Sequence, residues 1–369
     1  MCLLCEIHGR GTIIHDKEEV RQYEHAVRVV EAEKAGLTLL QYMRGKKRWG
    51  SLHGHSEFSL LDGAARVKDL ILKAKNMGQD FVAITDHGNM FGAVKAHKYA
   101  KEQGIKHIVG SEFYVTPRGK SRFDKTFKKG EKAFYHMVIL AKNKIGYQNL
   151  CRLSSIGWEE GFYRQPRIDR DVLEQYKEGL IVTSTCIGAT IPQAALKGDF
   201  YTADAEMEFM METFGNDFYV EIQNHGIEDE KIGFGYMREL AKKYNTPTII
   251  TTDSHYLDEE DMVTHDALLC IGTGQWVDQP NRAFQFEGTG YHYMGEEEVI
   301  KVFPNDIDSI YRSGEIADKC DDEVIPMGEV QLPYFNVPTA DEEFDRWRAE
   351  KCELSWLAVT DDTTTGGDE

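Results

Sequence analysis

The chain has 369 residues, of which 41% are hydrophobic and 11% aromatic, enough apolar side chains for one large domain with appendages or two ordinary domains. It contains no apolar run of about 18 residues and no long apolar segment near its start, which argues against a transmembrane helix and a signal peptide. Its 43 basic and 62 acidic side chains give a net charge of −19, which argues against tight nonspecific binding to nucleic acid.

The 7 cysteines are odd in number and widely scattered, as is typical of reduced thiols. We therefore expect a cytoplasmic protein without a disulfide framework. Cys2 and Cys5 form a lone CxxC, which is a weak zinc signal because no second pair accompanies it.

Residues 1–47 are interpreted as a partly helical appendage of unassigned role, with a potential capping box at Asp16 and Glu19. From residue 48, short apolar runs alternate with longer amphipathic ones. The apolar runs predict strands at 50–55, 81–85, 107–115, 135–141, 180–184, 218–223 and 247–251. The amphipathic runs predict helices near 64–77, 90–103, 144–158, 169–176, 200–214, 228–244 and 259–271. This alternation predicts an α/β fold with a parallel sheet, either doubly wound or closed into a barrel.

After these elements, residues 286–338 form a C-terminal extension with a glycine-rich, aromatic start and a helix near 306–320. Residues 339–369 are interpreted as an acidic tail. Its end, 358–369, is poor in apolar residues and is expected to be disordered.

Side chains of metal-ligand type recur at the ends of the apolar runs. They are His53, His55, Asp62, His87, Glu112, His136, Cys186, Asp253 and His255. Imidazole, carboxylate and thiolate groups hold zinc, manganese or iron, so the pattern predicts a multinuclear metal site. Residues so far apart in the sequence must converge on one point, which favours the closed barrel. In such folds the active site lies at the C-terminal ends of the strands.

Two motifs give the main support for a metal site. His53 and His55 flank Gly54, and residues two apart on an extended segment point to the same face. Asp253 and His255 repeat this spacing with a carboxylate and an imidazole.

Three candidates have simpler explanations when each is considered alone, whereas Glu112 is harder to explain in another way. Cys186 could be a buried apolar side chain, and Asp62 before Gly63 could be part of a turn. His136 could be a hydrogen-bonded core histidine. Glu112 lies within an apolar run and must face cations or hydrogen-bond donors, because an unpaired buried carboxylate is costly.

A basic loop separates the segments of Glu112 and His136. Between residues 118 and 132 it carries Arg118, Lys120, Arg122, Lys125, Lys128, Lys129 and Lys132 against Asp124 and Glu131. The loop is either a solvated connection or a flap that steers phosphates towards the site.

Seven segments closely resemble the PHP (polymerase and histidinol phosphatase) domain, in the version at the N-terminus of bacterial C-family replicative DNA polymerases. They are LHGHSEFSLLDGA, ITDHGNMFGAVK, GIKHIVGSEFYV, HMVILAKNKIGYQNLCRLSS, GFYRQPRIDRDVL, VEIQNHG and ITTDSHYL. The resemblance covers about residues 48–338. It implies a distorted seven-stranded (β/α) barrel over 48–285, with its metal site at the strand C-terminal ends.

The resemblance also implies three divalent transition-metal ions, of zinc, manganese or iron. His53, His55 and Asp253 would hold the first ion. Glu112 would bridge it to a second, which is held also by His136 and Cys186. Asp62, His87 and His255 would hold the third. Within this set His53, His55, Glu112 and Asp253 are the expected catalytic residues, and Arg118, Lys120 and Arg167 are candidates for binding substrate phosphates.

The implied function is a metal-dependent phosphoesterase, a 3′–5′ exonuclease that acts on DNA 3′ ends in replication and proofreading. Two alternatives remain open: a phosphatase for small phosphomonoesters, and a structural module that docks on a separate replicative polymerase subunit. The chain stops before the region where the family's palm would begin, so polymerisation by this chain alone is not expected. A free-standing domain of this type suggests a split replicase, for example of phage origin, or an engineered fragment.

Overall fold

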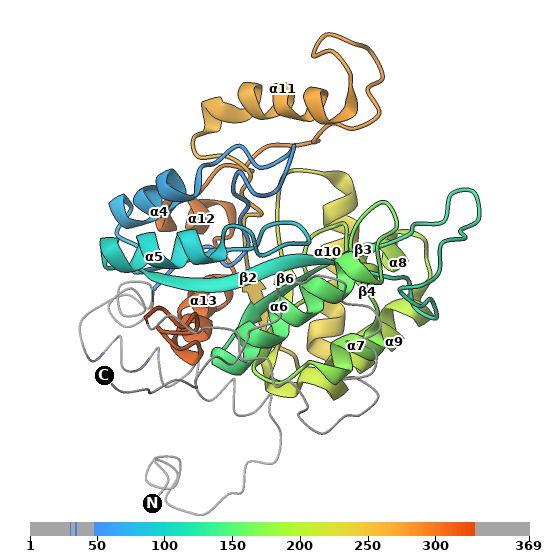
Figure 1. Cartoon of the computed structure of the whole chain (residues 1–369), viewed down its shortest axis with the longest axis horizontal. Coiled ribbons are helices and arrows are strands. Elements are labelled where there is room, and N and C mark those ends of the chain that lie inside the picture. The colour runs from blue at the N-terminus through green and yellow to red at the C-terminus, as the bar shows by residue number, and fades with distance from the viewer. Residues whose placement is uncertain (1–29, 31–33, 35–47, 329–369) are drawn as a thin grey trace, which may run out of the picture. The chain divides into compact units, whose positions relative to one another are not determined.

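The computed structural model describes residues 30, 34 and 48–328 (Figure 1). The chain divides into two compact units, Met1–Met327 and Gly328–Glu369, and every element named below belongs to the first. The predictions for the N-terminal appendage, for Cys2 and Cys5, and for the acidic tail lie outside the described residues. No helix in the described part of the chain is long and apolar enough to cross a bilayer.

Seven strands form one curled, mixed sheet. They are β1 (Phe81–Ile84), β2 (Lys106–Val115), β3 (Tyr135–Ala141), β4 (Arg167–Ile168), β5 (Leu180–Thr183), β6 (Phe218–Ile222) and β7 (Thr248–Ile250). Their order is β1-β2-β3-β5-β6-β7, and β4 pairs with β2. The prediction of a wholly parallel sheet is wrong at β3, which runs antiparallel to both β2 and β5. No crossover helix lies between β2 and β3, so the chain returns in the opposite direction.

The expected strand at 50–55 is not a regular strand, but it closes the sheet. The backbone N–H groups of Ala83 and Thr85 donate to the carbonyls of Ser51 and Gly54, at 3.1 and 2.8 Å. On its other side Gly54 forms a parallel bridge with Ser254, beyond the end of β7. The segment therefore lies between the first and last strands, and the predicted distorted (β/α) barrel is confirmed.

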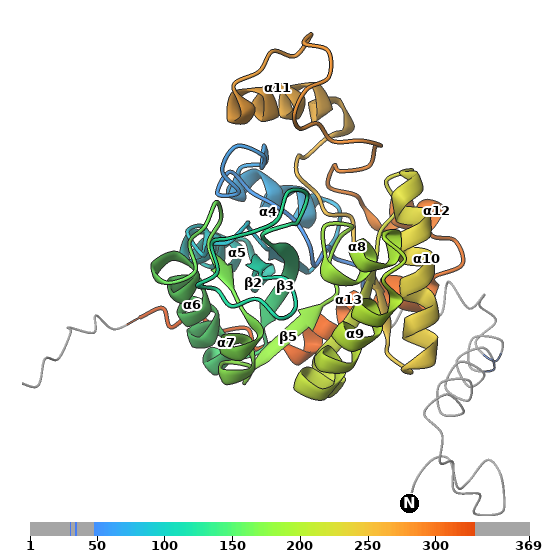
Figure 2. The same cartoon turned by 90° about the vertical axis from the view of Figure 1, so that its right-hand side faces the viewer.

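Helices surround the strands, as Figure 2 shows. They are α4 (Val67–Asn76), α5 (Ala93–Gln103), α6 (Lys144–Glu159), α7 (Arg170–Gln175), α8 (Thr190–Leu196), α9 (Phe200–Phe214), α10 (Glu228–Lys243), α11 (Met262–Thr273), α12 (Glu296–Val302) and α13 (Ile307–Lys319). All helices predicted after residue 48 are confirmed. The sequence reading missed α8, α12 and β4, which are short and have little periodicity to detect.

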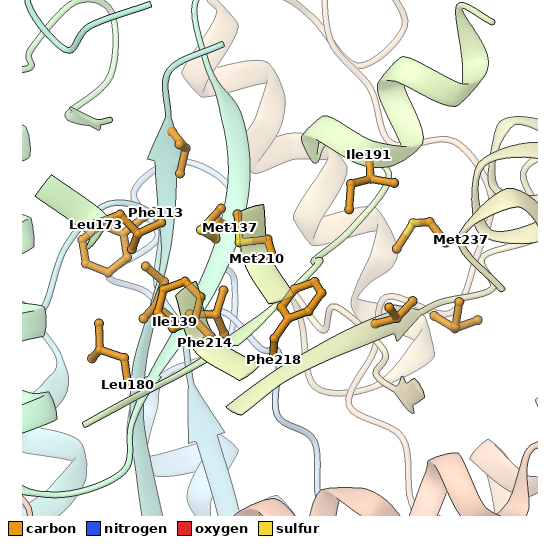
Figure 3. Packing of buried hydrophobic residues seen from close by; sticks show 14 of the residues in the cluster. Phe113, Met137, Ile139, Leu173, Leu180, Ile191, Met210, Phe214, Phe218 and Met237 are labelled. Atoms are coloured by element: carbon orange, nitrogen blue, oxygen red, sulfur yellow. The ribbon is translucent and has the colours of Figure 1, made fainter. Parts of the chain in front are cut away.

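The sheet separates two apolar layers. In β3 the side chains of Met137 and Ile139 belong to the cluster between the sheet and its helices, with Leu173, Met210 and Phe218 (Figure 3). Their neighbours Val138 and Leu140 belong to a second cluster with residues of β1, β2 and β7. This alternation is the period of two that an extended strand imposes, and it makes both faces of β3 apolar.

Helix α6 packs closely at its first turn because it carries a glycine there. The Asn143 side chain caps the helix by accepting a hydrogen bond from Gly146 N at 3.0 Å. A Cβ at Gly146 would lie 1.9 Å from the carbonyl oxygen of Gly179, which precedes β5.

We predict that Gly146→Ala destabilises the protein by about 1–3 kcal/mol, because the backbone of residue 179 must move. The matched control is Gly235→Ala in α10, where an added Cβ meets nothing within 4 Å. There the gain in helix propensity should stabilise by about 0.5–1 kcal/mol. Urea denaturation of both variants measures the difference, and equal effects would contradict this account of the packing.

Candidate metal centre

The barrel brings all nine predicted ligands to one edge of the sheet. His87 follows β1, Cys186 follows β5 and Asp253 follows β7, each within three residues of the strand end. Glu112 lies in the second half of β2. His136 lies at the start of β3, and because β3 is antiparallel, this start faces the same edge: His136 is in register with Tyr114 of β2.

Glu112 lies at the middle of the cluster and is almost fully buried. Its carboxylate oxygens are within 3.6 Å of five other candidates: His87 Nδ1 (2.7 Å), His136 Nδ1 (3.0 Å), His55 Nε2 (3.4 Å), Cys186 Sγ (3.4 Å) and His53 Nε2 (3.6 Å). This position suits the bridging role that the resemblance implies.

The remaining candidates contact the histidines that surround Glu112. Asp253 Oδ1 lies 3.2 Å from Nε2 of both His53 and His55. Asp62 Oδ2 lies 3.1 Å from His87 Nε2, and the His255 ring stacks on His55 with centroids 4.3 Å apart.

Three sets of ligand atoms each lie within 4.8 Å of one another: His55, His87 and His255; His53, His55 and Glu112; His87, Glu112 and His136. These sets overlap, because His55, His87 and Glu112 each belong to two of them. The division of the ligands among three ions therefore stays a prediction.

Unsatisfied polar atoms show that these residues fit divalent cations. His53 Nε2, His55 Nε2, His255 Nε2 and Asp253 Oδ1 are buried and have no hydrogen-bond partner. Buried polar atoms without partners are rare and costly. The other ring nitrogens are held: His53 Nδ1 lies 2.7 Å from Glu221 Oε1, and His55 Nδ1 lies 2.8 Å from Ser59 Oγ. A ring held at one nitrogen, with the other free, is how a metal-ligating histidine is typically oriented.

The electrostatics of the cluster favour ionised carboxylates. Burial by itself would raise the pKa of Glu112, but the imidazoles of His136, His87 and His53 hold it well below its usual value. Burial is likewise outweighed at Asp62, where His87 lowers the pKa to about 2. Burial and the neighbouring His55 lower the pKa of His255 to about 3, so this ring is neutral and can offer a lone pair to a cation.

Backbone strain accompanies three of the candidates. Asp253 itself has φ +45°, Thr185 before Cys186 has φ +62°, and Leu61 before Asp62 has φ +72°. Non-glycine residues rarely adopt this left-handed conformation, which costs about 1–3 kcal/mol per residue. The fold therefore places these three side chains at the cluster in spite of the backbone strain.

Glu221 of β6 was missed by the sequence reading. It is fully buried and accepts hydrogen bonds from the hydroxyls of Thr183 and Thr251 and from Gln223 Nε2, the last at 2.9 Å. The signal was present, because Glu221 is a carboxylate inside an apolar strand, as Glu112 is. Asp86, which accepts from Ser56 and Ser59, supports His55 through Ser59 in a similar way.

The three phosphate-binding candidates differ in accessibility. The Arg118 side chain is exposed and lies 3.6 Å from Glu206, and Lys120 Nζ lies 5.5 Å from the centre of the Phe127 ring. Arg167, by contrast, is fully buried. Its guanidinium donates to the carbonyls of Gly161, Ala133, Arg122 and Asp124 at 2.7–3.3 Å. The expectation that Arg167 binds substrate phosphate is therefore corrected: its donors are used to hold the basic loop.

A family model described as "PHP domain" matches residues 51–225. The DNA polymerase III subunit alpha of Borreliella burgdorferi is 42% identical over 296 residues, which are 80% of this chain and 26% of that protein. The Thermus aquaticus subunit is 38% identical over 326 residues, 86% of this chain and 26% of that protein. The chain thus spans about a quarter of these relatives. A solved structure from Bifidobacterium adolescentis aligns with a TM-score of 0.38 at 13% identity, covering 69% of this chain and 95% of that one.

We predict that Glu221→Ala lowers the affinity for divalent metal about 10–100-fold, because His53 loses the group that orients its ring. Calorimetric titration of the metal-free protein measures the affinity. Asp217→Asn is the control, because Asp217 is a partly buried carboxylate that pairs with Lys142 and Lys319 at the start of β6. An unchanged affinity in Glu221→Ala, or an equal loss in both variants, would argue against this role.

For Arg167→Met we predict a loss of at least about 2 kcal/mol of unfolding free energy, because four carbonyls lose their donor. Arg167→Lys should recover only part of it, since an ammonium cannot reproduce the planar fork. Thermal and urea unfolding test this. A variant with normal stability but a raised KM would instead restore the phosphate-binding role.

Proposed function

This chain belongs to the PHP domain family and is homologous to the PHP region of DNA polymerase III alpha subunits, and from that premise we propose that it is a metal-dependent phosphoesterase. We propose further that it removes nucleotides from DNA 3′ ends as a 3′–5′ exonuclease. The observation that carries the proposal is the convergence of nine ligand-type side chains, several of which direct unpartnered buried atoms at one another.

The nine residues would hold the cations, and neighbouring residues would orient these ligands or contact the substrate. When bound, the cations would lower the pKa of a water molecule and offset the charge that develops on the phosphoryl group. Glu221 and Ser59 orient His53 and His55. Arg118 and Lys120 lie on the loop that leaves β2 at the same edge, where they would meet the phosphates of the substrate.

The choice of DNA as substrate rests on the relatives. Their similarity to this chain extends through the barrel and beyond residue 225, where the family model ends, and they are DNA polymerase subunits. A small phosphomonoester remains the alternative substrate for the same centre.

A second candidate function is docking on a replicative polymerase subunit. Helix α11 and the segment after it stand apart from the other helices in both Figure 1 and Figure 2. They expose Val263, Ile271 and Trp276, each at least 70% accessible. Large exposed apolar patches mark contact sites for other proteins. Docking and hydrolysis are compatible, because this surface does not use the nine ligands.

We predict that His53→Ala and Asp253→Ala each lower hydrolysis of single-stranded DNA by at least about a thousandfold, because loss of a bound cation removes several kcal/mol of charge stabilisation. Metal analysis of the wild type should find more than one equivalent of transition metal. His97→Ala, at a buried histidine of α5 outside the cluster, should keep its activity. If His53→Ala keeps wild-type nuclease activity, the activity lies elsewhere.

The substrate is decided by a metal screen. Wild-type protein with Mn²⁺, Zn²⁺, Fe²⁺ or Co²⁺ is given a 5′-labelled single strand and a small phosphomonoester in parallel. Stepwise shortening from the 3′ end is the expected result. Hydrolysis of the monoester alone would favour the phosphatase. No hydrolysis with any metal, together with binding to a polymerase subunit, would favour the docking role.

A further inference from the structure

Beside the metal centre the surface carries three exposed aromatic side chains, which we name the aromatic ridge: Phe91, Trp158 and Phe162. Their accessible fractions are 58%, 44% and 46%. They come from two separate parts of the chain, since Phe91 follows the His87 loop whereas Trp158 and Phe162 lie at the end of α6 and just beyond it. Neither the metal ligands nor the hydrophobic core accounts for them.

The three rings form one continuous surface. Trp158 and Phe162 are stacked, with centroids 5.5 Å apart and planes 20° apart. Phe91 lies 6.3 Å from Trp158, with an angle of 31° between the planes. Together the three neighbouring rings leave about half of their side-chain surface accessible to solvent.

Hydrogen bonds fix the ridge to the metal centre. Trp158 Nε1 donates to the carbonyl of Gly88 at 3.0 Å, and Gly88 N donates to the carbonyl of Glu112 at 2.9 Å. Gly88 directly follows His87, so Trp158 is hydrogen-bonded to the residue next to a predicted ligand. A Cβ at Gly88 would meet Pro166 at 2.8 Å and Tyr114 at 3.0 Å, which shows how closely the segment after α6 packs on this loop.

Positive charge lies along the same border. The basic loop carries seven Lys and Arg side chains between residues 118 and 132, and its Phe127 stacks on Tyr163 at 5.5 Å, next to Phe162. Arg164 is exposed beside them. Of the two acidic neighbours at the end of α6, Glu160 is paired with Arg122 and Glu159 is exposed. Arg118 and Arg122 are also paired, with Glu206 and Asp169. In a chain with a net charge of −19, the loop nevertheless keeps an excess of positive charge, because its seven basic side chains outnumber Asp124 and Glu131.

We propose that the aromatic ridge and the basic loop together bind single-stranded DNA and lead its 3′ end to the metal centre. Unpaired bases stack on the rings, and the backbone phosphates contact the lysines. Aromatic platforms beside basic side chains are how proteins bind single strands without regard to sequence, and each stacked base contributes about 1–3 kcal/mol. The inference rests on the proposed function, because it names the form of DNA that this centre receives.

The test measures binding without hydrolysis. A labelled oligothymidylate is titrated with metal-free protein, and fluorescence anisotropy gives the dissociation constant. Phe162→Ala should weaken binding about 5–10-fold or more, as loss of one stacked base implies, and Phe91→Ala should weaken it similarly. The matched control is Phe200→Ala, because Phe200 is 50% exposed and also contacts one aromatic ring, Tyr236 of α10. This control should bind within twofold of the wild type.

An abasic strand of equal length separates stacking from charge. It keeps the phosphates but offers no bases, so wild type and Phe162→Ala should bind it equally. Replacing both Lys128 and Lys129 by Ala should reduce the slope of log affinity against log salt by about 1.4, because two phosphate contacts are lost.

Three results would overturn the proposal: no binding of the single strand by the wild type, an equal loss in Phe162→Ala and Phe200→Ala, or a Phe162→Ala effect that persists on the abasic strand. The first of these, with hydrolysis intact, would point to a protein contact at the ridge and would leave the exonuclease proposal standing. Conversely, specific binding without hydrolysis under any metal would overturn the exonuclease and leave the binding surface in place.

Discussion

The buried carboxylate of Glu112 is the constraint on which the rest of the site depends. A negative charge in the middle of a barrel strand is tolerated only when positive or polar groups surround it on every side. The imidazoles of His53, His55, His87 and His136 provide these groups within 3.6 Å. Their arrangement brings four chain segments to the same edge: residues 50–55, the end of β1, the second half of β2 and the start of β3. The fold of the barrel and the geometry of the site therefore depend on each other.

Around Glu112, a strained backbone and buried hydrogen bonds fix the orientation of the ligand side chains. Asp253 is held in a left-handed conformation, and the ring of His53 is oriented by Glu221, whose own carboxylate accepts three hydrogen bonds from side chains. Such supports reduce the freedom of the ligand atoms before any ion arrives, which lowers the entropy that binding must overcome. The unpartnered ring nitrogens are therefore oriented towards the cluster before an ion binds.

Local sequence patterns predicted most of the barrel but not its irregular parts. Strong apolar runs gave β1, β2 and β3 at nearly their true positions. The direction of β3 and the irregular path of 50–55 depend on hydrogen bonds between segments that lie far apart in the chain. The nine candidate ligands could be identified from the sequence because each follows or interrupts an apolar run. Glu221 was missed although it interrupts an apolar run as Glu112 does. The prediction for Arg167 was wrong because its hydrogen bonds to carbonyls of a distant loop leave no local sequence pattern.

The manner in which Arg167 holds the basic loop has an evolutionary consequence. Its guanidinium binds backbone carbonyls of Ala133, Arg122 and Asp124, and a carbonyl is present whatever side chain the residue carries. Substitutions along this loop can therefore change its charge and aromatic content while the anchor is kept. The side chains of this loop can thus vary with little loss of the stability that the Arg167 hydrogen bonds provide.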